Sequence, residues 1–236
     1  FREGDSLRQI DWKATARQRT PIAREYEDER DQQIMFMLDC GRQMRSQDGE
    51  LSHFDHALNA CLLLSHVALR QGDAVGLSTF ADDQPRYLAP VKGSGQLNVL
   101  LNTVYDLASS QRPADYQAAI RQLLTRQKRR ALVILMTNLQ DEDHGELTNA
   151  VQHLSRQHQV LVVSLREETL DQMRQDSVQT LPEALAYCGA VDYLNARAEL
   201  NERLMAHGTP VLDVPTSKLN TELVSIYLSW KKAGAL

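Results

Sequence analysis

The chain has 236 residues, and its 31 aspartate and glutamate residues outnumber its 26 lysine and arginine residues, so its formal net charge is −5 at pH 7. This length suits one large core, and the acidic balance disfavours nucleic acid as a partner because phosphate binding needs a concentrated basic face. No segment approaches the roughly 20 consecutive apolar residues of a membrane-spanning helix. The three cysteines form no C-x-x-C pair, which favours a reducing compartment.

Short apolar runs alternate with longer helical patterns from Gln33 onward. The runs are apolar throughout, which predicts buried strands of a doubly wound, mostly parallel α/β sheet covered by helices on both faces. We predict strands at 34–38, 74–80, 85–91, 131–136, 160–165 and 210–214. A short polar turn joins the second and third runs, so we expect these two to form an antiparallel hairpin at the sheet edge.

Helical spacing of apolar residues accounts for most of the remaining chain. The first predicted helix begins with a capping box formed by Ser52 and Asp55 and ends at Gly72. Further helices are predicted at 97–107, at 114–124, at 147–154 and at 169–207 with a break near Leu181 and Pro182. A final helix carries one apolar face made of Leu219, Leu223, Ile226, Tyr227 and Trp230.

The composition changes before the first predicted strand. We predict an N-terminal arm and acid-rich lead-in at 1–32, followed by the α/β domain at 33–236. The arm carries the pattern G-D-x-x-R-x-I-D-W-K-x-x-A-R from Gly4 to Arg17. Because the chain opens at Phe1 inside this pattern, we expect it to be a fragment of a longer protein.

The arm pattern resembles the signature of the bacterial DUF58 family, and the resemblance extends over most of the chain. It implies a von Willebrand factor A-like domain that works beside a MoxR-type AAA+ ATPase. It also implies membrane helices upstream, so that the domain would lie at the cytoplasmic face and reach the membrane only through a segment outside this chain. Because the family is not an established enzyme family, the resemblance implies a protein-interaction module, an adaptor in the assembly or maturation of protein complexes.

In an open parallel sheet, ligands bind outside the carboxyl ends of the strands. Metal-binding A-domains carry D-x-S-x-S there, and this chain keeps Asp39 but has Gly41 and Gln43 in place of the serines. The resemblance places Ala114 where a threonine is usual and Asn138 where an aspartate is usual. Four of the five ligand positions have thus lost their usual residue. We expect a degenerate metal site and no cofactor, with Asp39 as the ligand if Mg²⁺ binds.

Other chemical patterns are weaker. The loop at 93–98 matches part of a dinucleotide-binding pattern but lacks its third glycine. His53 and His56 lie three residues apart on a helix without a further ligand at suitable spacing, so we expect a solvated pair. A phosphatase-type nucleophile at Asp39 would need a second aspartate at position 41, which is glycine.

Two polar loops are the candidate interaction surface. Arg42, Arg45 and Asp48 follow the first strand, and Asp141 and Asp143 follow the strand at 131–136. The fold would bring both loops to the same sheet edge, where they could meet a protein partner. The alternative is that both are simply solvated loops.

The arm offers a further candidate. We expect Trp12 to be buried against the domain, with Asp11 in local ion pairs and Arg8 or Arg17 pairing with an acid at 25–31. The alternative is that Trp12 contacts a partner, since Trp and Arg dominate interface hot spots.

Two functions therefore remain open from the sequence. One is a non-catalytic interaction module; the other is an Mg²⁺-dependent adhesion domain or a metal-assisted hydrolase that uses Asp39.

Overall fold

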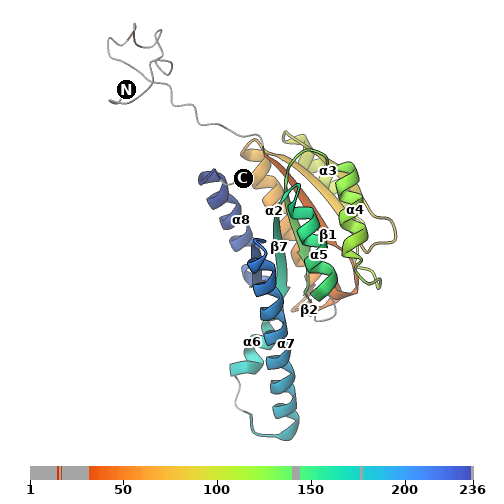
Figure 1. The fold of residues 1–236 in the computed structure, drawn as a ribbon, viewed down its shortest axis with the longest axis vertical. Coiled ribbons are helices and arrows are strands. Elements are labelled where there is room, and N and C mark those ends of the chain that lie inside the picture. The colour runs from red at the N-terminus through yellow and green to blue at the C-terminus, as the bar shows by residue number, and fades with distance from the viewer. Residues whose placement is uncertain (1–14, 16, 18–31, 140–143, 176–177, 235–236) are drawn as a thin grey trace. The chain divides into compact units, whose positions relative to one another are not determined.

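The computed structural model describes residues 15, 17, 32–139, 144–175 and 178–234 (Figure 1). The chain forms two units, Phe1–Asp31 and Gln32–Leu236. The predictions for Trp12, Arg8 and Asp11 fall outside the described residues, as does the acidic partner expected for Arg17. Arg17 itself is helical and exposed.

A six-stranded sheet forms the centre of the second unit. Its strands are β1 (Gln33–Asp39), β4 (Ala74–Phe80), β5 (Tyr87–Val91), β6 (Leu132–Thr137), β7 (Gln159–Arg166) and β8 (Val211–Pro215). Their order is β5-β4-β1-β6-β7-β8, and neighbouring strands are parallel except for the antiparallel pair of β4 and β5. The predicted parallel sheet with an edge hairpin is confirmed.

The sequence pattern missed one small sheet. The strands β2 (Gln47–Asp48) and β3 (Leu51–Ser52) form a separate antiparallel pair. Two residues are too short a run to show a polarity pattern of period two.

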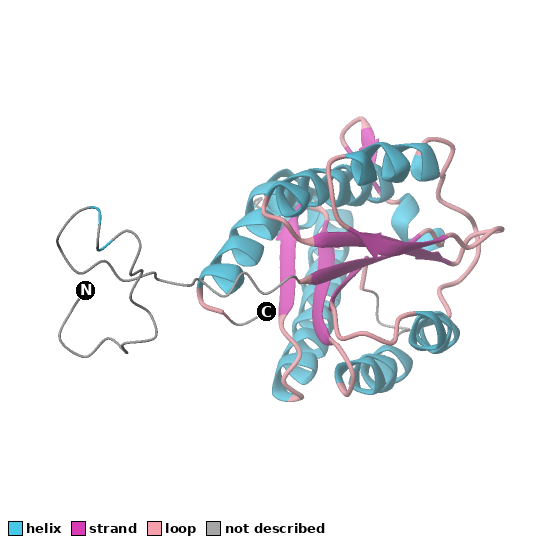
Figure 2. Cartoon of the chain, turned by 90° about the horizontal axis from the view of Figure 1, so that it is seen from above, coloured by secondary structure: helices cyan, strands magenta, loops and turns pink. Residues whose placement is uncertain are grey.

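Helices cover both faces of the central sheet (Figure 2). One face carries α2 (His53–Arg70), α3 (Gly95–Val104) and α8 (Thr216–Lys232). The other face carries α4 (Tyr116–Arg126), α5 (His144–Ser155) and α7 (Leu181–Ala206). Within β1, Phe36 packs into the first core and Met37 into the second, because successive strand side chains point to opposite faces. Two buried faces explain why the strand sequences are apolar throughout.

Two helices begin with reciprocal caps. The Ser52 hydroxyl accepts from the Asp55 N–H at 3.2 Å, and the Asp55 carboxylate accepts from the Ser52 N–H at 3.0 Å, as predicted. Thr180 and Glu183 form the same capping box at the start of α7. The predicted break at Pro182 is therefore the gap between α6 (Glu168–Gln175) and α7, with proline in the first turn, where no N–H is needed.

The helix α7 packs on the sheet only through its second half. Leu200 and Leu204 lie in the second core, whereas the residues at 181–189 are almost all exposed. Figure 1 shows this first half and α6 extending together away from the sheet. Among the described residues, no helix combines the length and the apolar composition needed to cross a membrane.

A buried carboxylate ties the last helix to the amino edge of the sheet. Asp73, just before β4, is almost fully buried. It accepts a hydrogen bond from the Tyr227 hydroxyl at 2.5 Å and pairs with the Lys231 ammonium at 2.8 Å. Burial, and then the hydrogen bond to Asp73, raise the pKa of Tyr227. The hydroxyl therefore stays protonated and donates.

Replacing Tyr227 by Phe should lower the free energy of unfolding by about 1.5–3 kcal/mol, because a hydrogen bond to a buried charge is lost. Urea denaturation followed by circular dichroism measures the change. Tyr105→Phe is the matched control, since Tyr105 is 82% exposed and should tolerate the same deletion. Equal midpoints for both variants would show that α8 is not fixed by this contact.

Candidate site at the carboxyl edge of the sheet

The side chain of Asp39 ends the central strand β1 and is fully buried, at 0% exposure. The Gly41 N–H donates to its Oδ1 at 2.7 Å, and the Thr137 hydroxyl donates to its Oδ2 at 2.7 Å. Both carboxylate oxygens thus have protein donors. Such bonds offset the cost of burying the charge.

The network continues from Thr137 into the loop after β1. The Tyr116 hydroxyl lies 3.0 Å from Thr137 Oγ1 and 3.2 Å from Gln43 Oε1. Tyr116 and Gln43 are both buried. The amide oxygen of Gln43, which could have replaced a serine ligand, is therefore a hydrogen-bond acceptor inside the protein.

The position of Gly41 is closed by the loop that precedes α4. The Arg112 carbonyl accepts from the Arg42 N–H at 2.9 Å, and the Ser110 N–H donates to the Cys40 carbonyl at 2.6 Å. A Cβ atom at position 41 would lie only 2.8 Å from the Arg112 carbonyl oxygen. Backbone packing therefore excludes the first serine of D-x-S-x-S.

The residues at the remaining two ligand positions also pack or form hydrogen bonds inside the protein. Ala114 packs against the second core and has no side-chain donor or acceptor. Asn138 donates to the Gln43 carbonyl at 3.3 Å, and its amide oxygen accepts from Arg197 at 2.9 Å. The neutral residue that replaces the usual aspartate thus meets an arginine instead of a cation.

Arg197, on α7, was not identified from the sequence. Its guanidinium is almost fully buried and pairs with Asp213, at 2.9 Å from Nη2 and 3.1 Å from Nε. It also donates to Ser164 Oγ and to the carbonyl oxygens of Leu139 and Leu165. The planar fork of arginine suits such a multi-contact position. The one available signal was an arginine on the helix face that also carries Leu200 and Leu204.

These residues do not fit an Mg²⁺ site of the A-domain type. Hard cations need several oxygen ligands that are free to coordinate. At this edge the oxygens of Asp39, Gln43 and Asn138 accept hydrogen bonds, and the Arg197 charge would repel a cation. Within 32–139, 144–175 and 178–234, no group of three or more His, Cys, Asp or Glu side chains is placed to hold a metal ion.

The neighbouring thiol is equally unsuited to nucleophilic chemistry. Cys40 is buried, and burial, followed by the Asp82 and Asp39 charges, raises its pKa far above the usual range. A thiol must lose its proton to act as a nucleophile. Cys40 therefore behaves as a small apolar side chain at the end of β1.

The structure presents only part of the predicted interaction surface. Arg42 and Arg45 lie exposed on the short 3-10 helix η2 (Arg42–Arg45) beside Asp39. Asp48 accepts from the Thr216 hydroxyl at 2.5 Å, so its charge is engaged at the start of α8. Asp141 and Asp143 lie outside the described residues.

The prediction of a solvated pair at His53 and His56 is wrong. His53 is completely buried, in a helix against which η2 and β3 pack. Neither ring nitrogen of His53 has a hydrogen-bond partner among the described residues. Burial lowers the pKa of His53, and the charges of Glu167 and Asp48 oppose that shift only in part.

The free energy of unfolding should fall as the pH drops below about 6.5. The unfolded chain holds His53 at an ordinary pKa and the folded chain at a lowered one, so unfolding takes up a proton in this range. The variant His53→Leu should show a shallower fall in urea titrations between neutral and mildly acidic pH. His66→Leu, an exposed site on the same helix, should keep the wild-type slope. A wild-type slope in His53→Leu would contradict this account.

Introducing the missing serine should damage the fold. We expect Gly41→Ser to lower the free energy of unfolding by about 1–3 kcal/mol, because the new Cβ collides with the Arg112 carbonyl. Gly95→Ser is the control, since a Cβ there meets open space. A stable Gly41→Ser variant would mean that the loop before α4 moves aside at little cost.

Similar solved structures show the fold. The conserved hypothetical protein BatB from Bacteroides thetaiotaomicron aligns with a TM-score of 0.54 at 15% identity, covering 86% of this chain and 99% of BatB. An aerotolerance-related membrane protein from Bacteroides fragilis gives 0.53 at 17% identity, covering 85% and 99%. A von Willebrand factor type A structure from Catenulispora acidiphila gives 0.50 at 12% identity, covering 87% and 42%.

Comparison with curated protein sequences gave no match. The sequence profile of the family described as "Protein of unknown function DUF58" matches residues 1–184, which is most of the chain. Together with the mostly parallel sheet between two helical layers, this confirms the resemblance. The chain belongs to the DUF58 family, and its second unit has a von Willebrand factor A-like fold.

Proposed function

We propose that this domain is a non-catalytic protein-interaction module that binds its partner at the carboxyl edge of the sheet without a metal ion. The observation that carries the proposal is the closed hydrogen-bond network around Asp39. In a metal-dependent A-domain the cation would supply the contact to a partner's carboxylate. Here Arg42 and Arg45 place exposed positive charges beside Asp39.

Arg42 and Arg45 lie on η2, whose backbone is held in place by packing and hydrogen bonds. Between them, Gln43 and Met44 are buried, and the Met44 N–H donates to the Gly41 carbonyl at 3.1 Å. The Arg42 N–H is fixed by the Arg112 carbonyl at 2.9 Å. A surface whose backbone is already ordered loses little conformational entropy on binding. Guanidinium groups suit bidentate recognition of carboxylates.

The chemistry of the edge favours binding over catalysis. A hydrolase would need an activated nucleophile with a base in reach. The Asp39 oxygens accept protein hydrogen bonds and Cys40 is a buried thiol of raised pKa. His53 is buried and donates to no nucleophile among the described residues. These observations give the metal-assisted hydrolase and the Mg²⁺-dependent adhesion domain no support.

For the partner, we propose a MoxR-type AAA+ ATPase, with the domain acting as an adaptor in the assembly or maturation of protein complexes. The family resemblance of the chain supports this choice. We further propose that the domain works at the cytoplasmic face and meets the membrane only through segments outside these residues.

Reversing both arginines, Arg42→Glu with Arg45→Glu, should slow association with the cognate MoxR-type ATPase by about ten-fold or more at low salt. Lost electrostatic complementarity acts mainly on the association rate. Surface plasmon resonance with the immobilised ATPase separates association from dissociation.

The matched control is Arg129→Glu with Arg130→Glu, which makes the same charge change at exposed residues next to the amino end of β6. Equal association rates for the two double variants would move the interface away from η2. No binding by the wild-type chain would remove the proposed partner.

A further inference from the structure

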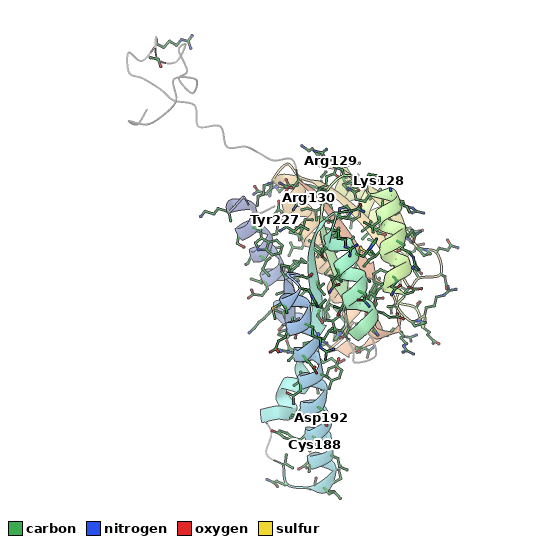
Figure 3. The ribbon with its side chains drawn as sticks, viewed as in Figure 1. Lys128, Arg129, Arg130, Cys188, Asp192 and Tyr227 are labelled. Carbon is green, nitrogen blue, oxygen red and sulfur yellow. The ribbon has the colours of Figure 1, made fainter. Side chains whose placement is uncertain are left out.

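The helix α6 and the first half of α7, residues 168–175 and 178–193, form a hairpin that is a separate surface next to the candidate site. Arg197 is fixed at the carboxyl edge by Asp213, so the residues that precede it on α7 lie beyond the sheet. The helix α6 packs against α7 along this projection. Figures 1 and 3 show the hairpin extending away from the sheet, with Cys188 and Asp192 on its α7 arm.

Large apolar side chains are exposed on this hairpin. Leu181 is 75% exposed and Leu185 is 66% exposed, the highest values for any leucine among the described residues. They are four residues apart and Cys188 follows three residues later, so all three share one helix face. Val178 and Tyr187 add further exposed apolar area. Single exposed leucines are ordinary, but a cluster of this kind marks an interaction site.

The same segment is acidic. Residues 168–175 and 178–193 contain four carboxylates and one arginine, a net charge of −3. These are Glu168, Asp171, Arg174, Glu183 and Asp192. An apolar helix face within an acidic segment calls for a partner that is both apolar and basic.

We infer that the hairpin docks a basic amphipathic helix of a partner protein. Leucines at i and i+4 offer the apolar spacing that a helix-in-groove contact uses. A second copy of this chain fits poorly, since its hairpin would bring another −3 charge to the same contact. The inference rests on the proposed interaction function, but it uses a surface distinct from Arg42 and Arg45.

The test uses the full 236-residue chain and a synthetic fluorescent helix made of leucine and lysine, with leucine at i, i+3, i+4 and i+7. Two further peptides are controls: one with the same residues in shuffled order, and one with glutamate in place of lysine. Fluorescence anisotropy gives the dissociation constants. We expect the ordered lysine helix to bind most tightly, to weaken as salt is raised, and the glutamate helix not to bind.

The decisive variant is Leu181→Ser with Leu185→Ser, which should weaken binding of the lysine helix by about ten-fold or more. Leu63→Ser with Leu101→Ser is the matched control, since both leucines are 42% exposed and lie on α2 and α3. Equal binding by both double variants, or equal binding of the ordered and shuffled peptides, would overturn the inference. So would a wild-type dimer in sedimentation that Leu181→Ser with Leu185→Ser converts to a monomer, because the face would then belong to a second copy.

Chemical modification of Cys188 tests the same helix face in the wild-type protein, in case the leucine variant loses helix content. Cys188 is exposed, whereas Cys40 and Cys61 are buried and burial raises the pKa of both thiols, that of Cys61 to about 12. A bulky polar maleimide should therefore modify Cys188 selectively in the wild-type fold and prevent binding of the lysine helix. Undiminished binding after complete modification would contradict the inference.

Peptide binding to the hairpin can be tested separately from ATPase binding at η2. Arg42→Glu with Arg45→Glu should leave binding of the lysine helix to the hairpin unchanged or slightly stronger. Peptide binding without ATPase binding would keep the hairpin as a docking surface and remove the ATPase as partner. ATPase binding without peptide binding would keep the ATPase as partner and remove the hairpin as a docking surface.

Discussion

The carboxyl edge of the sheet depends on one constraint, the burial of the Asp39 carboxylate at the end of the central strand. A buried charge must be paired or hydrogen-bonded. This fold meets the requirement with the Gly41 N–H and the Thr137 hydroxyl, which approach from its own loop and from β6. The backbone at 110–112 packs over the same loop. The donors thus come from the protein itself, where an A-domain of the metal-binding type uses a cation.

The arrangement also links the edge to the projecting hairpin. Asn138 contacts the loop of Gln43 on one side and Arg197 on the other. Arg197 joins α7 to the ends of β7 and β8 through Ser164 and Asp213. Truncating this arginine would remove the ion-pair partner of the partly buried Asp213 carboxylate, which would keep the hydrogen bond from the Asn201 amide. The base of the hairpin and the loops around Asp39 therefore share one polar network.

Local patterns in the sequence were sufficient to predict most of the fold. Continuous apolar runs predicted the sheet, and the capping box at Ser52 and the proline at 182 predicted helix starts or breaks, because each depends on neighbouring residues. The loss of ligands at Gly41 was visible too. Its cause was not, since the collision comes from Arg112, far along the chain. Arg197 and the burial of His53 were missed for the same reason: long-range packing decides both.

Protein donors, and no cation, satisfy the Asp39 carboxylate. Electron paramagnetic resonance of Mn²⁺ mixed with the chain at neutral pH tests it most directly, with Asp39→Asn as the comparison. The free Mn²⁺ signal should be the same for wild type and variant, because the Asp39 oxygens accept hydrogen bonds from the protein and Asn138 is bonded to Arg197. A bound Mn²⁺ population in the wild type that disappears in Asp39→Asn would contradict it.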